Sequence, residues 1–344
     1  MQTIVVLRLS ALGDILHTLP AFRLLRSSFP ESRILWVAER RCLPLLEMVE
    51  GIDDLLPIDT RALRRGENLR ENLRALRDLR RVRPDLSLDF QGTLKSAFTG
   101  LLLGSKERMG FAGENLREGA ASPLYTKRAA PFDEGEHVTR KNLHLLTLLG
   151  LEPGRPLYPG IRIPAQAQES LGKKAGGHSP RRVLLNVGGA WKTKRWPSPS
   201  WAKTALGLKE RGYDPLLLWG APAEEAQAWE ISRLTGGQVL PTPFLTLPEV
   251  TALLEGSLLT VSADSFPLHM ADALGRLTVG LFGPTPPKRN GPLNPLSATV
   301  TSGLECSFCF RRECDTMACM NRITPENLLL RIEEVLTKGS DSAR

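Results

Sequence analysis

Short apolar, β-branched runs alternate with longer stretches of helical periodicity along nearly the whole chain. In the first half, the runs predict strands at residues 3–9, 33–38, 54–58 and 86–90. The stretches between and after them predict helices at residues 14–28, 42–49, 68–82, 94–103 and 138–149. Strands separated by helices of this length are typical of βαβ units in a parallel sheet. The first half therefore predicts a doubly wound α/β domain.

The second half repeats this alternation. It predicts strands at residues 182–187, 215–219, 258–262 and 278–282, and helices at 201–211, 223–234, 247–254, 268–274 and 325–336, the last with Thr324 as N-cap. Residues 163–180 have the composition of a linker, and 344 residues suffice for about two domains. We therefore expect domains at 1–165 and 166–344, with the last helix able to pack back on the first domain. Ligands of open α/β sheets bind at the carboxyl ends of the strands, so we expect the site in a cleft that both domains share.

The composition excludes several classes of protein. Charged residues make up 24% of the chain, close to the globular average, so disordered and fibrous proteins are excluded. No apolar run approaches the roughly 18 to 20 residues that span a bilayer. Arg8 and Asp14 interrupt the apolar start, which does not fit a signal peptide. We expect a cytoplasmic protein.

The net charge of +8 is concentrated in one segment. Residues 61–83 contain nine arginines and three acidic residues, a net of +6. The segment is either a solvated helix face or an electropositive surface for an anionic partner. It contains no aromatic residue that could stack on a base, so we expect no nucleic-acid partner.

Three strand-to-helix junctions carry polar residues suited to a ligand. The first contains Gly13 and Asp14, which is either a first-turn carboxylate or a general base. The second junction contains glycines and a basic residue suited to phosphate, namely Gly188, Gly189 and Lys194. The third is a hydroxyl-bearing loop before a helix, with Asp264, Ser265 and His269. Lys194 and His269 each also have an ordinary structural interpretation. The G-x-G-x-x-G and Walker A patterns are absent, which disfavours nicotinamide-dependent and P-loop enzymes.

These motifs, in this order, resemble glycosyltransferase family 9, the ADP-heptose:lipopolysaccharide heptosyltransferases. The most specific matching segments are residues 12–20 (LGDILHTLP), 89–96 (DFQGTLKS), 194–197 (KRWP), 219–222 (WGAP) with Glu224, 264–269 (DSFPLH) and 282–285 (FGPT). The resemblance covers nearly the whole chain. It implies a GT-B fold of two Rossmann-like domains facing a central cleft, and an inverting, metal-independent transfer of heptose from ADP-heptose to the Kdo-lipid A inner core.

The resemblance also implies roles for individual residues. Asp14 matches the proposed general base. The donor-binding positions are Gly188, Gly189, Lys194, Glu224, Asp264, Ser265 and His269, with Lys194 on phosphate and Glu224 toward the ribose. We assign acceptor binding to Gly13, His17, Arg61, Arg64, Gln91 and Lys95. The acceptor is lipid-linked and anionic, so the basic segment predicts peripheral association with the inner face of an anionic membrane. No cofactor is required.

One position departs from the family pattern. The family's loop usually reads D-[ST]-G-x-x-H, and this chain has Phe266 where glycine is usual. Phenylalanine does not easily adopt a positive φ, so either the loop does not need one or the donor lies differently.

The cysteines form a second unusual feature. Cys306, Cys309, Cys314 and Cys319 lie within a short segment and Cys42 lies far away. A structural zinc site, unligated thiols, a disulfide or a cluster all fit this count, although the spacing is not the paired C-x2-C pattern. We assign no metal to catalysis.

Two alternatives to heptosyl transfer stay open at this point. The chain could be a family 9 transferase that uses another nucleotide sugar or another glycan acceptor. Less in keeping with the motifs, it could be a basic nucleic-acid-binding protein with a four-cysteine metal module.

Overall fold

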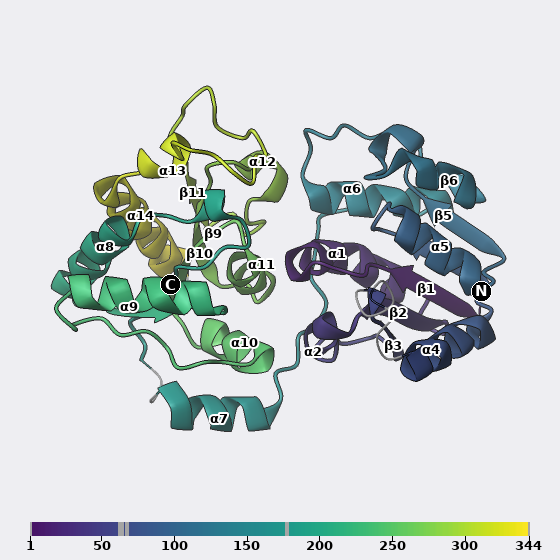
Figure 1. Ribbon diagram of the computed structural model, residues 1–344, viewed down its shortest axis with the longest axis horizontal. Coiled ribbons are helices and arrows are strands. Elements are labelled where there is room, and N and C mark those ends of the chain that lie inside the picture. Colours follow the sequence, from purple (N-terminus) through teal and green to yellow (C-terminus); the bar gives the residue numbers. More distant parts are fainter. Residues whose placement is uncertain (1, 61–64, 66–68, 176–178, 343–344) are drawn as a thin grey trace. The chain divides into compact units, whose positions relative to one another are not determined.

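The protein divides into two compact units, Met1–Arg162 and Ile163–Arg344. The structure is a computed structural model that describes residues 2–60, 65, 69–175 and 179–342. Each unit contains one parallel sheet with helices on both faces (Figure 1). The predicted α/β class with two Rossmann-like domains is confirmed. The units separate after Arg162, whereas the sequence prediction placed the boundary after residue 165.

The first unit is built on a six-stranded sheet of order β3-β2-β1-β4-β5-β6. The strands are β1 Thr3–Leu7, β2 Arg33–Glu39, β3 Asp54–Ile58, β4 Leu86–Asp89, β5 Glu107–Gly110 and β6 Lys127–Arg128. In β1, the consecutive residues Ile4, Val5 and Val6 are fully buried. Such unbroken burial arises because helices cover both faces of a parallel sheet.

The helices of the first unit divide between the two faces of its sheet. They are α1 Leu12–Ser28, α2 Leu43–Leu46, α4 Leu69–Val82, α5 Leu94–Leu102 and α6 Val138–Leu145, with 3₁₀ turns at Arg40–Cys42, Gly113–Asn115, Gly119–Leu124 and Leu146–Leu149. Leu79 of α4 and Leu103, just after α5, share a core with Leu7 of β1 and Leu35 of β2. Trp36, the next residue in β2, stacks edge-on against Phe22 of α1 at 5.6 Å between ring centroids. Because side chains alternate along a strand, α1 lies on the opposite face from α4 and α5.

The second unit has a five-stranded sheet of order β11-β10-β9-β7-β8. Its strands are β7 Arg182–Asn186, β8 Asp214–Leu218, β9 Leu259–Ala263, β10 Leu277–Leu281 and β11 Ala298–Val300. Its helices are α7 Ala165–Ala175, α8 Ser198–Glu210, α9 Pro222–Leu234, α10 Leu247–Glu255, α11 Phe266–Ala273, α12 Pro287–Asn290, α13 Ala318–Asn321 and α14 Pro325–Ser342, with a 3₁₀ turn at Lys192–Lys194. Trp196 and Trp201 pack edge to face at 5.0 Å in the main core. The helix α14 packs on α8, β10 and β11.

Several predicted element boundaries are wrong for identifiable reasons. The expected linker at residues 163–180 contains α7, whose Ser170 and Lys174 bind the buried carboxylate of Glu249 in α10. The expected helix at residues 42–49 is a 3₁₀ turn followed by α2, which contains a proline near its start. The short strands β5, β6 and β11 were not predicted, because they are short and lack a long apolar run.

No helix in the described part of the chain is long and apolar enough to cross a membrane. All five cysteines are free thiols, with Cys306, Cys309 and Cys314 exposed and Cys319 buried. Within the described ranges, no three histidine, cysteine or acidic side chains are grouped so that they could hold a metal ion. The cysteine segment therefore gives no support to the zinc hypothesis, and no disulfide forms.

Candidate active site

A lysine, an aspartate and a histidine meet at the carboxyl edge of the second sheet. Asp264 directly follows β9, and Lys194 lies in the turn after β7, the neighbouring strand. The Lys194 ammonium donates to Asp264 Oδ2 at 2.7 Å and to the Asp264 carbonyl oxygen at 3.0 Å. Nε2 of His269, on the first turns of α11, lies 2.9 Å from Asp264 Oδ1. The sheet order thus brings Lys194 to Asp264 and His269, a pair that lies about 70 residues further along the chain.

Burial and charge define the state of this cluster. The side chains of Asp264 and His269 are each only 4% exposed, and that of Lys194 is 12% exposed. Burial alone raises the pKa of Asp264, but the hydrogen bond and charge of His269 and the Lys194 ammonium hold it well below its usual range. Asp264 is therefore a buried carboxylate that fixes the lysine. The Lys194 ammonium also lies 4.4 Å from the centre of the Trp191 ring.

The loop before α11 is held by hydrogen bonds from two directions. Asn186, at the end of β7, donates from Nδ2 to the hydroxyl oxygens of Ser262 at 3.0 Å and Ser265 at 3.1 Å. Asn290 of α12 donates to Asp264 Oδ2 at 3.0 Å. Ser265 is the N-cap of α11 in an extended conformation. The start of α11, whose backbone amides favour an anion, is thereby held in one place beside Lys194.

Phe266 occupies a position that needs no glycine. It is the first residue of α11, and it is not one of the described non-glycine residues whose φ is positive. A side chain is therefore accommodated there without backbone strain. The departure from the family pattern does not distort the loop.

Glu224 joins the loops that follow β7 and β8. Its Oε1 accepts from the amide of Gly189 at 2.9 Å, and its Oε2 accepts from the amide of Gly220 at 2.9 Å. A Cβ at Gly188 would lie 2.5 Å from the carboxyl carbon of Glu224, so a side chain there would displace the Glu224 carboxylate from its two amide partners. Each carboxylate oxygen has a second lone pair, so Glu224 can still accept from a ligand hydroxyl.

In the first unit, Asp14 lies in the first turn of α1. Its Oδ2 accepts from the Ala11 amide at 3.2 Å, which caps the helix, and its Oδ1 lies 3.4 Å from Nη2 of Arg8. The Asp14 side chain is 39% exposed, whereas that of Arg8 is 8% exposed. Arg8 also donates to the carbonyl oxygen of Phe90. Asp14 thus has a capping role and an accessible carboxylate oriented by a buried guanidinium.

Gln91 and Lys95 flank the same end of the first sheet. Gln91 Oε1 accepts from the Leu9 amide at 3.0 Å, so it fixes the loop that leads to Asp14. The Lys95 ammonium donates to Thr60 Oγ1 at 2.7 Å and lies 3.3 Å from Oε1 of the buried Glu39. The Lys95 side chain is 49% exposed, so its charge faces solvent as well.

The other predicted acceptor residues differ in accessibility. Gly13 lies in the first turn of α1 and is partly exposed. His17 is only 4% exposed and packs edge-on against the His137 ring at 5.5 Å, so it lies within the unit instead of presenting a surface. Arg61 and Arg64 lie outside the described residues.

Sequence reasoning missed several residues of these clusters, among them Arg8, Asn186, Glu39 and Asn290. Arg8 was visible as a charge at the end of an apolar strand, and Asn186 as a polar residue at the end of another. Glu39 and Asn290 gave no such signal, because their roles depend on strand neighbours and on loop packing. Their partners, Lys95 and Asp264, were predicted.

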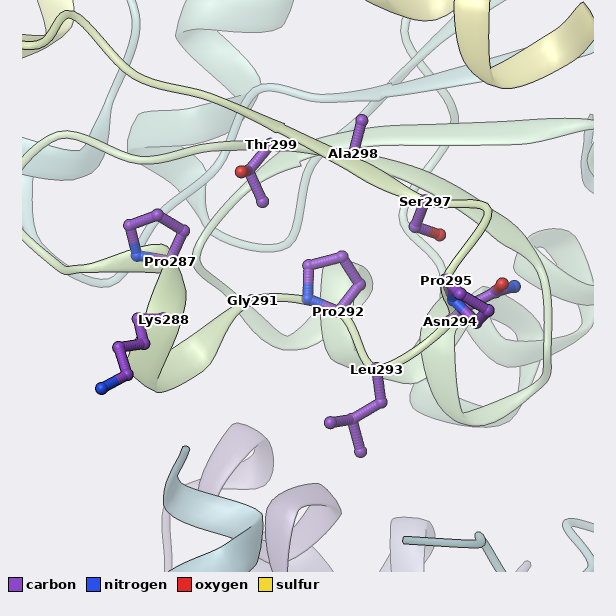
Figure 2. A pocket seen from close by; sticks show the side chains of 10 residues that line it. All are labelled: Pro287, Lys288, Gly291, Pro292, Leu293, Asn294, Pro295, Ser297, Ala298 and Thr299. Carbon is purple, nitrogen blue, oxygen red and sulfur yellow. The ribbon is translucent and has the colours of Figure 1, made fainter. Parts of the chain in front are cut away.

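A separate cavity of about 430 Å³ lies between α12 and the segment that leads into β11 (Figure 2). Its lining includes Pro287, Lys288, Pro292 and Asn294. None of the predicted site residues lines it. The candidate active site is therefore distinct from this cavity.

The chain is similar to several known proteins. A model of glycosyltransferase family 9 (heptosyltransferase) matches residues 72–319. Lipopolysaccharide heptosyltransferase 1 of Pseudomonas aeruginosa is 28% identical, and the alignment covers 97% of this chain and 98% of that protein. Among solved structures, Escherichia coli heptosyltransferase WaaC with ADP-2-deoxy-2-fluoro heptose superposes with a TM-score of 0.76 at 23% identity, over 97% of this chain and 99% of that one. Escherichia coli ADP-heptose lps heptosyltransferase II gives a TM-score of 0.78 at 21% identity, over 99% and 100%.

The solved relatives share the predicted fold, and the family model spans most of the chain. The resemblance seen in the sequence motifs is confirmed. The protein belongs to glycosyltransferase family 9 and is a glycosyltransferase with the GT-B fold.

Proposed function

We propose that this enzyme transfers heptose from ADP-heptose to the lipid A-linked core of lipopolysaccharide, on the cytoplasmic face of the inner membrane. The relatives named lipopolysaccharide heptosyltransferase and the WaaC structure that holds an ADP-heptose analogue support the substrates. The observation that carries the proposal is the fixed Lys194 ammonium beside the start of α11. Together, this ammonium and the amides at the start of α11 form a site for a departing diphosphate.

The second unit binds the donor in this proposal. Negative charge grows on ADP as the bond to the anomeric carbon breaks, so fixed cations and amides at that point lower the barrier. Lys194 supplies the cation, while the amides of Ser265 and Gly188 supply further hydrogen-bond donors. The Gly189 amide holds Glu224 in place. The carboxylate of Glu224 accepts from a ribose hydroxyl, which selects a nucleoside over inorganic diphosphate.

The first unit supplies the base. Asp14 takes the proton of the acceptor hydroxyl as that oxygen forms its bond to the anomeric carbon, and the electron pair of the breaking bond leaves with ADP. Arg8 orients the carboxylate through its contact with Oδ1. The attack from the opposite side inverts the anomeric carbon. Every charge in this scheme is met by a protein group, so it requires no metal.

The acceptor carries phosphates and carboxylates, which match the cations of the first unit. Lys95 is held by Glu39 and Thr60 and remains about half exposed. The arginine-rich segment, which includes Arg61 and Arg64, adds a long-range attraction toward an anionic membrane. Peripheral association then places the enzyme at its lipid-linked substrate.

Donor choice tests the substrate assignment. Purified enzyme is given a lipid A-linked acceptor with ADP-heptose, ADP-glucose or a UDP-sugar, and nucleotide release is followed. We expect rapid release only with ADP-heptose. Faster turnover with another nucleotide sugar would replace the donor and leave the family assignment intact.

The role of Asp14 is tested by Asp14→Asn, which keeps the size of the side chain. Loss of a general base lowers turnover by about 10²- to 10⁴-fold. ADP binding, measured by calorimetry, should stay close to that of the wild type, since the donor groups lie in the other unit. Wild-type turnover in Asp14→Asn would exclude Asp14 as the base.

A further inference from the structure

Three large apolar side chains are exposed along one face of α5. Leu94, Phe98 and Leu101 are 45%, 52% and 41% exposed. Their spacing of four and then three residues places them on the same side of the helix, and we call them the α5 stripe. The side of α5 that faces the sheet is closely packed, because a Cβ at Gly100 would lie only 3.1 Å from Leu7 of β1. The stripe is therefore not an unfilled part of the core.

A strongly basic helix lies beside the α5 stripe. The helices α4 and α5 contact each other and cover the same face of the sheet. The exposed basic residues that α4 presents are Arg70, Arg74, Arg77, Arg80 and Arg81. Arg83 follows and lies beside Gly104, just after the end of α5, where a Cβ would be 3.9 Å from its Cγ. Against these cations, Asp78 is an exposed acidic residue of α4, 4.0 Å from Arg81.

An apolar stripe beside a basic helix indicates a binding surface, whereas scattered apolar residues do not. Single exposed leucines are normal on a protein surface. An apolar stripe next to a row of arginines is the pattern of helices that lie in the plane of an anionic bilayer, with apolar side chains at the acyl boundary and cations at the headgroups. The stripe has one aromatic ring, too few for a surface that stacks nucleobases.

We propose that the α4–α5 face docks on an anionic lipid bilayer, with the α5 stripe inserted below the headgroups and the α4 arginines on lipid phosphates. This inference rests on the proposed function in one respect, since a lipid-linked acceptor gives the docking its purpose. It goes beyond a general attraction of basic residues to a membrane, because it assigns binding energy to three named apolar side chains.

The expected effects follow from burial and charge. Each side chain of the stripe is about half exposed, so its insertion strengthens binding by roughly fivefold. Loss of all three side chains then weakens binding by about 100-fold. Each arginine near an anionic surface contributes a similar factor, which falls as salt increases.

The test is co-sedimentation of the full-length enzyme with vesicles. The vesicles contain either phosphatidylcholine alone or equal parts of phosphatidylcholine and phosphatidylglycerol, at low and high salt. The stripe variant is Leu94→Gln/Phe98→Gln/Leu101→Gln. The matched control is Leu157→Gln/Leu234→Gln/Leu330→Gln, which changes three leucines that are 49%, 49% and 58% exposed elsewhere on the protein.

We expect the wild type and the matched control to bind the anionic vesicles alike, and the stripe variant to bind about 100-fold more weakly. Arg77→Gln/Arg80→Gln should weaken binding and reduce its salt dependence. Phe98→Trp keeps the stripe apolar, so it should bind like the wild type and add tryptophan fluorescence that lipids with brominated acyl chains quench.

Other results would overturn the proposal. They are wild-type binding by the stripe variant, no binding of the wild type to anionic vesicles, and no quenching in Phe98→Trp. A dimer that the stripe variant dissociates, without any change in vesicle binding, would assign the stripe to a second copy of the chain instead.

An activity measurement separates this proposal from the proposed function. With a deacylated, water-soluble acceptor, the stripe variant should transfer sugar at the wild-type rate, because the stripe holds no substrate group. If the wild type binds vesicles but transfers no heptose to any acceptor, the proposed function fails and the docking surface stands.

Discussion

The buried carboxylate of Asp264 should contribute strongly to the free energy of unfolding of the second unit. Asp264→Asn keeps the shape of the side chain and removes its charge. The Lys194 ammonium, whose side chain is 12% exposed, then loses its counter-charge at 2.7 Å. Removing one partner of a buried ion pair costs about 3 to 5 kcal/mol, because the other charge stays buried without compensation. We expect a loss of about 3 kcal/mol in the free energy of unfolding.

The lowered pKa of Asp264 also predicts how the stability of the second unit changes with pH. Burial raises the pKa of Asp264, but His269 and Lys194 hold it well below the usual value in the folded protein. In the unfolded chain the carboxyl titrates near 3.9. The unfolded state therefore binds more protons below that pH, and the stabilisation that is present above it is lost as the pH falls toward the folded value. The wild type should lose this stability in acid, whereas Asp264→Asn should not.

The assay is urea unfolding followed by tryptophan fluorescence, to which Trp196 and Trp201 in the core of the second unit contribute. The control is Glu169→Gln in the same unit, where Glu169 and its partner Lys173 are 69% and 73% exposed and pair at 2.6 Å. An exposed pair contributes at most about 1 kcal/mol. A loss below about 1 kcal/mol in Asp264→Asn, or equal losses in both variants, would refute the reasoning.

Three smaller changes have defined expectations. Gly188→Ala brings a Cβ within 2.5 Å of the Glu224 carboxyl carbon and displaces that carboxylate, so it should cost about 1 to 3 kcal/mol in urea unfolding and weaken ADP binding in calorimetry. A neutral result would mean that the contacts of Glu224 contribute nothing to stability or to ADP binding. Tyr125→Phe removes the hydroxyl that donates to the buried Asp89 at 2.7 Å, which should cost about 1 to 3 kcal/mol in urea unfolding of the first unit. Thr93→Ala removes the N-cap of α5 and should cost about 1 kcal/mol, while Thr93→Ser should lower the unfolding midpoint much less.

The sequence predicted the elements whose pattern is local. The central strands are recognisable because both faces of each sheet are covered, which makes residues such as Ile4, Val5 and Val6 uniformly apolar. The edge strand β6 is exposed at both of its residues and carries no such signal. The helix α7 lies in a segment with the composition of a linker, and its bonds to Glu249 of α10 are not visible in its own sequence.

The candidate site divides in the same way. Asp14 and Gly188 are placed by the strand-to-helix junctions that contain them, so the sequence could nominate them. The contact between Lys194 and Asp264 depends on β7 lying next to β9, and sheet order is not encoded in any local pattern. The link between Glu39 at the end of β2 and Lys95 in the first turn of α5 likewise joins separate elements. Such contacts needed the structure.

The central claim is heptosyl transfer to the lipopolysaccharide core, and product mass tests it most directly. Wild-type enzyme is incubated with ADP-heptose and each of two acceptors, the unheptosylated Kdo-lipid A and its heptosylated form, and the glycolipids are analysed by mass spectrometry. We predict that one acceptor gains the mass of a single heptose, with an equal amount of ADP released. Release of ADP without any gain in mass, or an unchanged acceptor in both reactions, would contradict the account.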